Sequence, residues 1–502
     1  MTRNRPGGTT VPTRISSGVP GLDAVLGGGF MRGGVYIIRG APGTGKTTLG
    51  HQLCFAHIRR DRGRALYATL LAEGHARMML HLDGMSFFDP AAVPDSLYYV
   101  SAFRTLEEEG LRGLVGLMRK EAVRLGAGVA VLDGFVAAAL AARDDNELKR
   151  FVHDLQAIAG VTGCTMFLLT SAGAADHAVT PEQTMVDGIV ELTRLPRDAL
   201  TERRLEVHKF RGGDYLDGRH SLRITAEGIV VYPRFEAIYG DPPESDPNGG
   251  RVTTGVADLD LALHGGLPAA TSTLIVGATG TGKTTLGLHF LAAASASEPG
   301  LLFSFYEAPP RLRAKARSLG LDLDAAIEAK HLELLWQAPT ERMLDALGHR
   351  LVGAVHRLGA RRVVVDGIGG FVEGAAEPER LKRFFAALAN ELRAAGTTTL
   401  FTVETPRLFG PDVDLPMSGV SSVAENMLLL RLLELDGRLR RTLAVLKVRD
   451  SDFDAALQEF MIGPSGIALA PGAFEGAESV LTGSARRTRG PERDGGGSSM
   501  GH

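Results

Sequence analysis

The chain contains two copies of one pattern, and this repeat limits its fold more than any other feature. Residues 17–23 (Ser-Gly-Val-Pro-Gly-Leu-Asp) reappear as residues 254–260 (Thr-Gly-Val-Ala-Asp-Leu-Asp). Residues 40–47 (Gly-Ala-Pro-Gly-Thr-Gly-Lys-Thr) reappear as residues 277–284 (Gly-Ala-Thr-Gly-Thr-Gly-Lys-Thr), again 237 positions later. Solenoid repeats are only about 20–50 residues long, whereas this period suits a whole domain. The sequence therefore predicts two tandem copies of one domain.

Short apolar runs alternate with helical patterns in each copy, which predicts the α/β class. The runs are continuous rather than alternating, as expected of parallel strands buried on both faces and covered by helices. They cover residues 35–38, 65–69, 129–132 and 166–169 in the first copy and residues 273–276, 301–305, 363–365 and 400–403 in the second. Further strands are expected at 204–208 and 442–448, and a helical stretch around Trp336.

Composition shifts mark the expected domain boundaries. We expect an N-terminal extension (1–13), a first domain (14–240), a Pro/Gly/Asp-rich linker (241–250), a second domain (251–475) and a disordered Arg/Gly/Ser-rich tail (476–502). The net charge is −3 and only two cysteines occur. These values argue against a nucleic-acid partner, a disulfide scaffold and a cysteine zinc cluster. With no apolar signal core or membrane span, a cytoplasmic protein is expected.

Both copies carry the phosphate-loop motif G-x-x-x-x-G-K-[ST] directly after an apolar run. Its glycines let successive N–H groups face phosphate oxygens, and the helix that begins at the lysine adds its positive dipole end. Lysine is expected to reach the β- and γ-phosphates of ATP, and threonine to offer its hydroxyl to Mg²⁺. The predicted nucleotide-binding residues are Gly43, Thr44, Gly45, Lys46, Thr47 and Thr48 in the first copy and Gly280, Thr281, Gly282, Lys283, Thr284 and Thr285 in the second.

An aspartate follows an apolar run in each copy, at Asp133 and at Asp366. Such a residue can simply cap a helix. Its pairing with a phosphate loop favours a role at the metal, beside Thr47 and Thr284.

The chain resembles the KaiC-like ATPases, double RecA-fold proteins of the circadian-clock type. The resemblance covers about residues 14–470 and rests on the glycine-aspartate motif, both phosphate loops, the two aspartates and two late Lys-x-Arg pairs. It implies two RecA-like domains per chain and a homo-oligomer, a hexamer with ATP between subunits. It also implies partners of the KaiB or two-component signalling kind.

The resemblance further implies that Lys209, Arg211, Lys447 and Arg449 reach an ATP bound by the neighbouring subunit. A cation supplied in trans would stabilise charge on the leaving phosphate. Only nine of the 55 basic residues are lysines, and four of the nine fall in the two loops and the two pairs. The alternative is a surface strand with solvated cations.

In the family, two adjacent glutamates after the second strand position the attacking water. The second copy has Tyr306 and Glu307 there, and alignment from Gly84 and Gly320 places Leu70 and Leu71 in the first. Glu73 stands two residues further on; it is either a substitute or an exposed loop carboxylate. The predicted catalytic residues are therefore Glu307, Lys283, Lys46 and Glu73, with the second copy better equipped for phosphoryl transfer.

Clock proteins of this family phosphorylate themselves just before a strand of the second domain. Ser421 and Ser422 stand at that place, although Ser422 and Glu425 also fit a helix-capping box. The leading hypothesis is an ATPase and serine autokinase in signalling or timing. A RecA/RadA-type DNA-dependent ATPase and an ATP-sensing scaffold with little turnover are the alternatives. Salt-sensitive DNA binding would favour the first of these, and absence of both phosphate release and phosphoserine the second.

Overall fold

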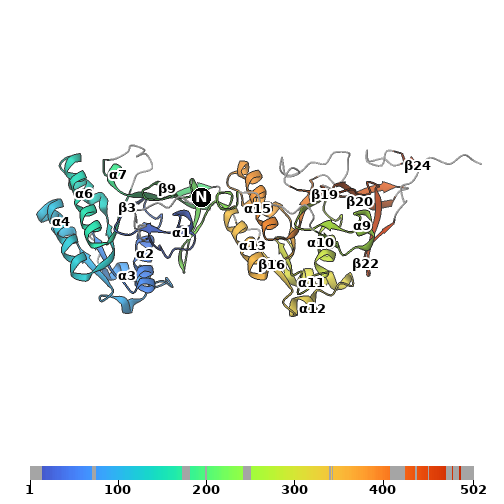
Figure 1. Cartoon of the computed structure of the whole chain (residues 1–502), viewed down its shortest axis with the longest axis horizontal. Helices are drawn as coiled ribbons and strands as arrows, with labels where there is room; N and C mark the ends of the chain where they lie inside the picture. The colour runs from blue at the N-terminus through green and yellow to red at the C-terminus, as the bar shows by residue number, and fades with distance from the viewer. Residues whose placement is uncertain are drawn as a thin grey trace, which may run out of the picture. The chain divides into compact units, whose positions relative to one another are not determined.

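The chain divides into two compact units, Met1–Ile238 and Tyr239–His502 (Figure 1). The computed structural model describes residues 14–70, 75–171, 181–197, 200–240, 250–338, 341, 343–406, 424–435, 438–449, 451–470, 477–478 and 486–487. Each unit is described by itself below.

The described part of the first unit is built on a nine-stranded sheet in the order β11-β10-β9-β8-β3-β7-β6-β4-β5. The strands from β8 to β5 are parallel, and β9, β10 and β11 extend the sheet as antiparallel hairpins. The strands are β3 (Val35–Gly40), β4 (Arg64–Thr69), β5 (Leu97–Ser101), β6 (Ala127–Asp133), β7 (Thr165–Thr170), β8 (Gly188–Arg197), β9 (Leu200–Phe210), β10 (Arg219–Thr225) and β11 (Gly228–Tyr232), with a separate pair β1 (Arg14–Ile15) and β2 (Phe30–Met31).

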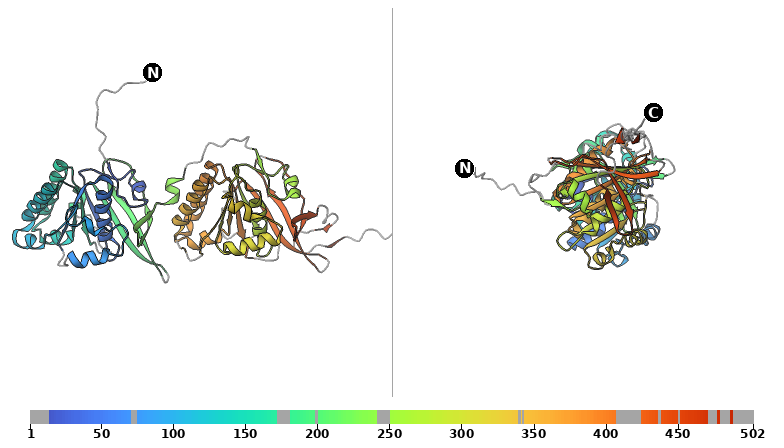
Figure 2. Two further views of the ribbon diagram at one scale, coloured as in Figure 1. Left: turned by 90° about the horizontal axis from the view of Figure 1, so that it is seen from below. Right: turned by 90° about the vertical axis from the view of Figure 1, so that its right-hand side faces the viewer.

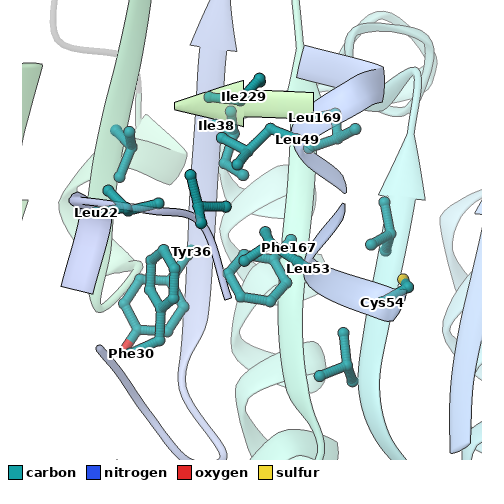
Figure 3. Close-up of a cluster of buried hydrophobic side chains, with 14 of the residues drawn as sticks. Leu22, Phe30, Tyr36, Ile38, Leu49, Leu53, Cys54, Phe167, Leu169 and Ile229 are labelled. Atoms are coloured by element: carbon teal, nitrogen blue, oxygen red, sulfur yellow. The ribbon is translucent and has the colours of Figure 1, made fainter. Parts of the chain in front are cut away.

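Helices cover both faces of this sheet. Leu49 and Leu53 of α2 pack on Ile38, Phe167 and other residues of one face (Figure 3). Residues of α4, α5 and α6 pack on the alternate residues of the same strands, on the other face. The helices are α1 (Leu22–Val25), α2 (Lys46–Asp61), α3 (His75–Leu82), η1 (Pro90–Ala92), α4 (Phe103–Leu125), α5 (Phe135–Ala141), α6 (Asp145–Thr162), α7 (Pro181–Met185) and α8 (Phe235–Ile238).

The second unit repeats this topology strand for strand, with the order β16-β15-β17-β18-β14-β19-β20-β21-β22. Its parallel part again ends in antiparallel hairpins. The strands are β14 (Ser272–Gly277), β15 (Gly300–Ser304), β16 (Leu332–Trp336), β17 (Arg362–Asp366), β18 (Thr398–Glu404), β19 (Asn426–Leu435), β20 (Arg438–Lys447), β21 (Gln458–Gly463) and β22 (Gly466–Ala470), with the short pairs β12 (Arg251–Val252)/β13 (Leu267–Pro268) and β23 (Ala477–Glu478)/β24 (Arg486–Arg487).

Helices also flank the second sheet, and α13 and α15 lie side by side (Figure 2). Leu286 and Leu288 of α10 belong to the core that includes Leu302 and Val364 of the strands. The helices are α9 (Ala257–Ala262), α10 (Lys283–Ala292), α11 (Pro309–Ser318), α12 (Leu323–Glu328), α13 (Leu344–Leu358), α14 (Gly369–Gly374), η2 (Pro378–Arg380) and α15 (Leu381–Ala394).

The predicted fold class is confirmed: the chain has two α/β domains of RecA-like type, each a mostly parallel sheet flanked by helices. The expectation for Trp336 is wrong. This residue ends the edge strand β16, where its Nε1 donates a hydrogen bond to the Phe305 carbonyl oxygen (3.0 Å). The mixed run Leu-Glu-Leu-Leu-Trp suits a half-buried edge strand as well as a helix. The predicted linker and tail stay predictions, because they lie largely outside the described residues.

Candidate functional site

The two phosphate loops have the same backbone conformation. Gly43 and Gly45 have φ angles of 77° and 107°, and Gly280 and Gly282 have 76° and 109°. Residues other than glycine rarely adopt such angles. Gly45 and Gly282 precede the first residues of α2 and α10, so each loop delivers the chain to a helix N-terminus. Inside the loops Thr44 and Thr281 are fully buried and bond back to Ala41 and Ala278.

Each motif lysine lies folded over its own loop. Lys46 Nζ donates to the carbonyl oxygens of Gly40 (2.7 Å) and Ala41 (3.0 Å). Lys283 Nζ donates in the same way to Gly277 and Ala278, both at 2.7 Å. Partial burial lowers the pKa of both ammonium groups. A group in this position gains by exchanging carbonyl partners for the stronger, charged oxygens of a phosphate.

The motif threonines contact the predicted aspartates. Thr47 Oγ1 lies 3.1 Å from Asp133 Oδ2, and Thr284 Oγ1 lies 3.2 and 3.0 Å from the two oxygens of Asp366. Burial raises the pKa of both aspartates, against the lowering effect of the hydroxyl donors. A hydroxyl and a carboxylate at the foot of a phosphate loop form the oxygen-donor set that Mg²⁺ accepts.

The two copies support this aspartate differently. In the first, the buried Tyr67 hydroxyl donates to Asp133 at 2.8 Å. In the second, Thr402 Oγ1 donates to Asp366 at 2.8 Å. Sequence reasoning missed both donors. Tyr67 sits two positions before the end of β4 and gives no motif, whereas Thr402 is recognisable only once β18 is placed beside β17.

Glu307 follows β15 and forms an ion pair with Lys315 of α11 (Oε1 to Nζ, 3.2 Å). The Glu307 carboxylate also helps burial to raise the pKa of Asp366. Tyr306 is exposed, and its hydroxyl donates to Glu373 Oε1 (3.2 Å). Burial raises the pKa of Tyr306 to about 12, and Glu373 contributes further. The phenol is therefore neutral at physiological pH.

The structure moves the expected correspondence in the first copy by one residue. Thr69 pairs with Asp133 as Ser304 pairs with Asp366. Counted along the sequence from these pairs, Tyr306 and Glu307 correspond to Leu71 and Ala72, which lie outside the described residues. Leu70 then matches the buried Phe305. The first copy still carries no carboxylate at either position.

Five predicted site residues take no part in the contacts given above. Glu73, Ser421 and Ser422 lie outside the described residues, so their assignments stay predictions. Thr48 and Thr285 lie in the first turns of α2 and α10, and Thr285 is buried.

The Lys-x-Arg pairs lie away from the phosphate loop of their own unit. In the first sheet, Lys209 lies at the level of Ile37 on the other side of β8, three residues before Gly40. In the second sheet, Lys447 lies at the level of Leu274, three residues before Gly277. At about 3.3 Å per residue, each lysine is roughly 10 Å toward the amino end of the sheet.

In the first unit both cations of the pair bind carbonyl oxygens at the end of α7. Lys209 Nζ donates to Gln183 and Thr184, and Arg211 donates to Thr184 and Met185. In the second unit Lys447 Nζ donates to the Ala424 carbonyl oxygen (2.9 Å), and Arg449 is exposed. The hydrogen bonds of Lys209, Arg211 and Lys447 described here therefore go to residues outside the phosphate loops.

Other arginines, which sequence reasoning missed, do lie against the loops. Arg441 Nε of β20 lies 3.4 Å from the Gly280 carbonyl oxygen. Arg194 of β8 lies close to Gly43, since its Nη1 would be 3.9 Å from a Cβ built there. A chain with so many arginines offers no signal that would single these two out.

Two other features are not found among the described residues. None of the described helices has the length and apolar character of a membrane span. Nor do the described side chains include a group of three or more His, Cys, Asp or Glu residues placed to hold a metal ion. A metal at either phosphate loop would therefore depend on the Thr–Asp pair and on ligands supplied by a phosphate.

Comparison with known proteins gives one consistent result. The family model described as "ATPase: KaiC" matches residues 15–236 and 252–473. The chain is 24% identical to the circadian clock oscillator protein KaiC of Picosynechococcus sp., over 94% of this chain and 92% of that protein. It is 25% identical to the circadian clock protein KaiC3 of Synechocystis sp., over 94% of each chain, and 25% identical to KaiC2 of the same organism, over 94% of this chain and 84% of that one.

Proposed function

The chain belongs to the KaiC ATPase family, and on this premise we propose that it binds Mg–ATP at both phosphate loops and transfers the γ-phosphoryl group mainly at the second. The observation that carries the proposal is the recurrence of one arrangement in both units. Each loop has its lysine at a helix N-terminus and its threonine against a buried aspartate. Such an arrangement suits a polyphosphate with a bound divalent cation.

The second site is proposed to work as follows. Lys283 leaves its carbonyl partners for the β- and γ-phosphates, and the N–H groups of the loop cradle the same phosphates. Thr284 and Asp366 hold Mg²⁺, which when bound neutralises charge on the two terminal phosphates. Glu307 polarises the attacking oxygen from the end of the neighbouring strand β15. The first copy has leucine and alanine at that place, so we propose that it binds ATP and turns over slowly.

Assembly is proposed to complete each site. We propose that the Lys-x-Arg pairs contact the ATP of a neighbouring chain, because the strand register places them about 10 Å from the phosphate loop of their own unit. A ring in which each subunit gives its cations to the next has a heterologous interface, which closes into a cyclic oligomer such as a hexamer. Arg211 and Arg449 are both exposed.

The output is proposed to be phosphorylation of Ser421 or Ser422. The hydroxyl oxygen would attack the γ-phosphorus, the bond to the β–γ bridging oxygen would break, and the serine proton would pass to a carboxylate of the site. Phosphoserine adds nearly two negative charges, which would alter a ring surface read by signalling partners. The relatives' names are those of clock proteins, so regulation of a timing or signalling kind is the natural setting.

Labelled ATP tests the proposal. Lys283→Ala should abolish incorporation of labelled phosphate into the chain, while Lys46→Ala should chiefly impair ring assembly measured by light scattering. Mass spectrometry on the wild type and on Ser421→Ala/Ser422→Ala identifies the acceptor. Incorporation that survives Lys283→Ala but fails in Lys46→Ala would refute the division of roles between the two copies.

A further inference from the structure

We propose that Glu404, at the end of β18, is a second carboxylate of the copy-two site and accepts the proton of the attacking water. The inference rests on the proposed function and adds to it a residue that no motif identifies. β18 lies between β14, which leads into the phosphate loop, and β17, which ends in Asp366. Glu404 pairs with Gly277, the first residue of the loop. It therefore stands at the carboxyl edge of the sheet, where ligands of such folds bind.

Strand geometry places the Glu404 side chain on the face of the sheet that holds the metal ligands. Thr402 directs its hydroxyl to Asp366, which is also in contact with Thr284. Side chains two residues apart on a strand share a face. Glu404 is two residues beyond Thr402, so it occupies the same face at the rim, next to the Thr284–Asp366 pair.

Backbone contacts bring this strand end to the catalytic lysine. The Gly277 carbonyl oxygen accepts hydrogen bonds both from Lys283 Nζ (2.7 Å) and from the Thr405 N–H (3.2 Å). The residue before Thr405 is thus adjacent to the ammonium group. Burial lowers the pKa of Lys283, and the nearby Glu404 carboxylate opposes that effect; the same carboxylate also helps burial to raise the pKa of Tyr306.

Glu404 and Glu307 differ in their contacts. Glu307 is engaged in an ion pair with Lys315 at 3.2 Å. Glu404 is exposed and has no hydrogen-bond or ion-pair partner among the described residues. In the first copy, counting on from the pair Arg39–Thr170 places Ser171 opposite Gly40. The carboxylate is therefore specific to the copy proposed to carry out the chemistry.

The proposed step is hydrolysis of the bond between the γ-phosphorus and the β–γ bridging oxygen. The water oxygen forms a bond to the γ-phosphorus, the bond from that phosphorus to the β–γ bridging oxygen breaks, and ADP leaves with the electron pair. The water proton passes to a Glu404 carboxylate oxygen and from there to solvent. Glu307, held by Lys315, orients the water from the other side of Asp366.

The test uses the full-length chain and Glu404→Gln, which keeps the shape of the side chain and removes its basicity. Copy-two turnover is the total rate of phosphate release minus the rate of Lys283→Ala. Proton acceptance by a positioned group contributes on the order of 10²–10⁴-fold. We expect Glu404→Gln to lower copy-two turnover by about 10²-fold. Glu328→Gln, which removes an equal charge from the exposed end of α12, should leave it unchanged.

Binding of a non-hydrolysable ATP analogue separates this role from a structural one. Removing a negative charge beside Lys283 should leave the affinity unchanged or raise it a few-fold at low salt. A copy-two rate within about threefold of wild type, or a loss of rate that comes with much weaker analogue binding, would overturn the proposal. If Lys283→Ala itself leaves phosphate release unchanged, the proposed function fails, and this inference falls with it.

Discussion

Removing the hydroxyl of Tyr67 measures how much its hydrogen bond to Asp133 stabilises the first unit. Tyr67 is fully buried, and its hydroxyl donates to Asp133 Oδ2 at 2.8 Å. Tyr67→Phe removes that hydroxyl and leaves the ring in place, so no large cavity forms. A hydrogen bond to a charged group contributes about 1.5–3 kcal/mol, so the free energy of unfolding of the first unit should fall by about 2 kcal/mol. For a domain of this size, that lowers the melting temperature by about 4–8 °C.

Scanning calorimetry of the full chain measures the change, and amide hydrogen exchange in β6 and β17 assigns it to a unit. Thr402→Val is the matched variant in the second unit, because Thr402 donates to Asp366 and accepts from the Gly367 N–H (2.7 Å). Tyr67→Phe should destabilise β6 and spare β17, and Thr402→Val should do the reverse. A shift below about 1 °C for Tyr67→Phe would refute the idea that this hydroxyl supports the site.

Three further predictions concern single side chains. Glu307→Gln should lower copy-two turnover by about 10²–10⁴-fold if its carboxylate polarises the attacking oxygen; an unchanged steady-state rate removes it from the mechanism. Lys315→Met should free Glu307 from its ion pair and change turnover without changing analogue affinity, and an equal change in both would contradict a positioning role. The hydrogen bond from His208, together with Arg39, lowers the pKa of Glu191 to about 2. A lowered pKa stabilises the fold above the ordinary value and loses that effect as the pH falls. Glu191→Gln should therefore destabilise the first unit by about 1–3 kcal/mol at pH 7 and progressively less below pH 4.5, as melting curves across pH would show; a penalty independent of pH would contradict this assignment.

The fold and the two Thr–Asp contacts were predictable because their signals are local. Continuous apolar runs predict β3, β6, β14 and β17, and the glycines of the loops predict a backbone that other residues rarely adopt. Asp133 and Asp366 could be identified because an aspartate at the end of a parallel strand is expected at the same edge of the sheet as the phosphate loop.

The remaining site residues depend on contacts between distant parts of the chain. Thr402 and Glu404 meet the loop only through the register of β18 beside β14 and β17. The Lys315–Glu307 ion pair is local, eight residues apart between the end of β15 and α11, but it matches no motif. The same limitation explains the misassigned helix at Trp336, whose short apolar run fits either type of element until β15 is seen to pair with β16.

The central claim is that a phosphate loop of one chain works with the cations of the next, and a mixing experiment tests it most directly. Lys283→Ala lacks the loop lysine, and Lys447→Ala/Arg449→Ala lacks the cations; each alone should lose copy-two phosphate release. In co-expressed random rings, about one quarter of all interfaces combine an intact loop with intact cations from the neighbour, since the interface is heterologous. The account predicts recovery of about one quarter of the wild-type copy-two rate. No recovery above the two separate variants would contradict it.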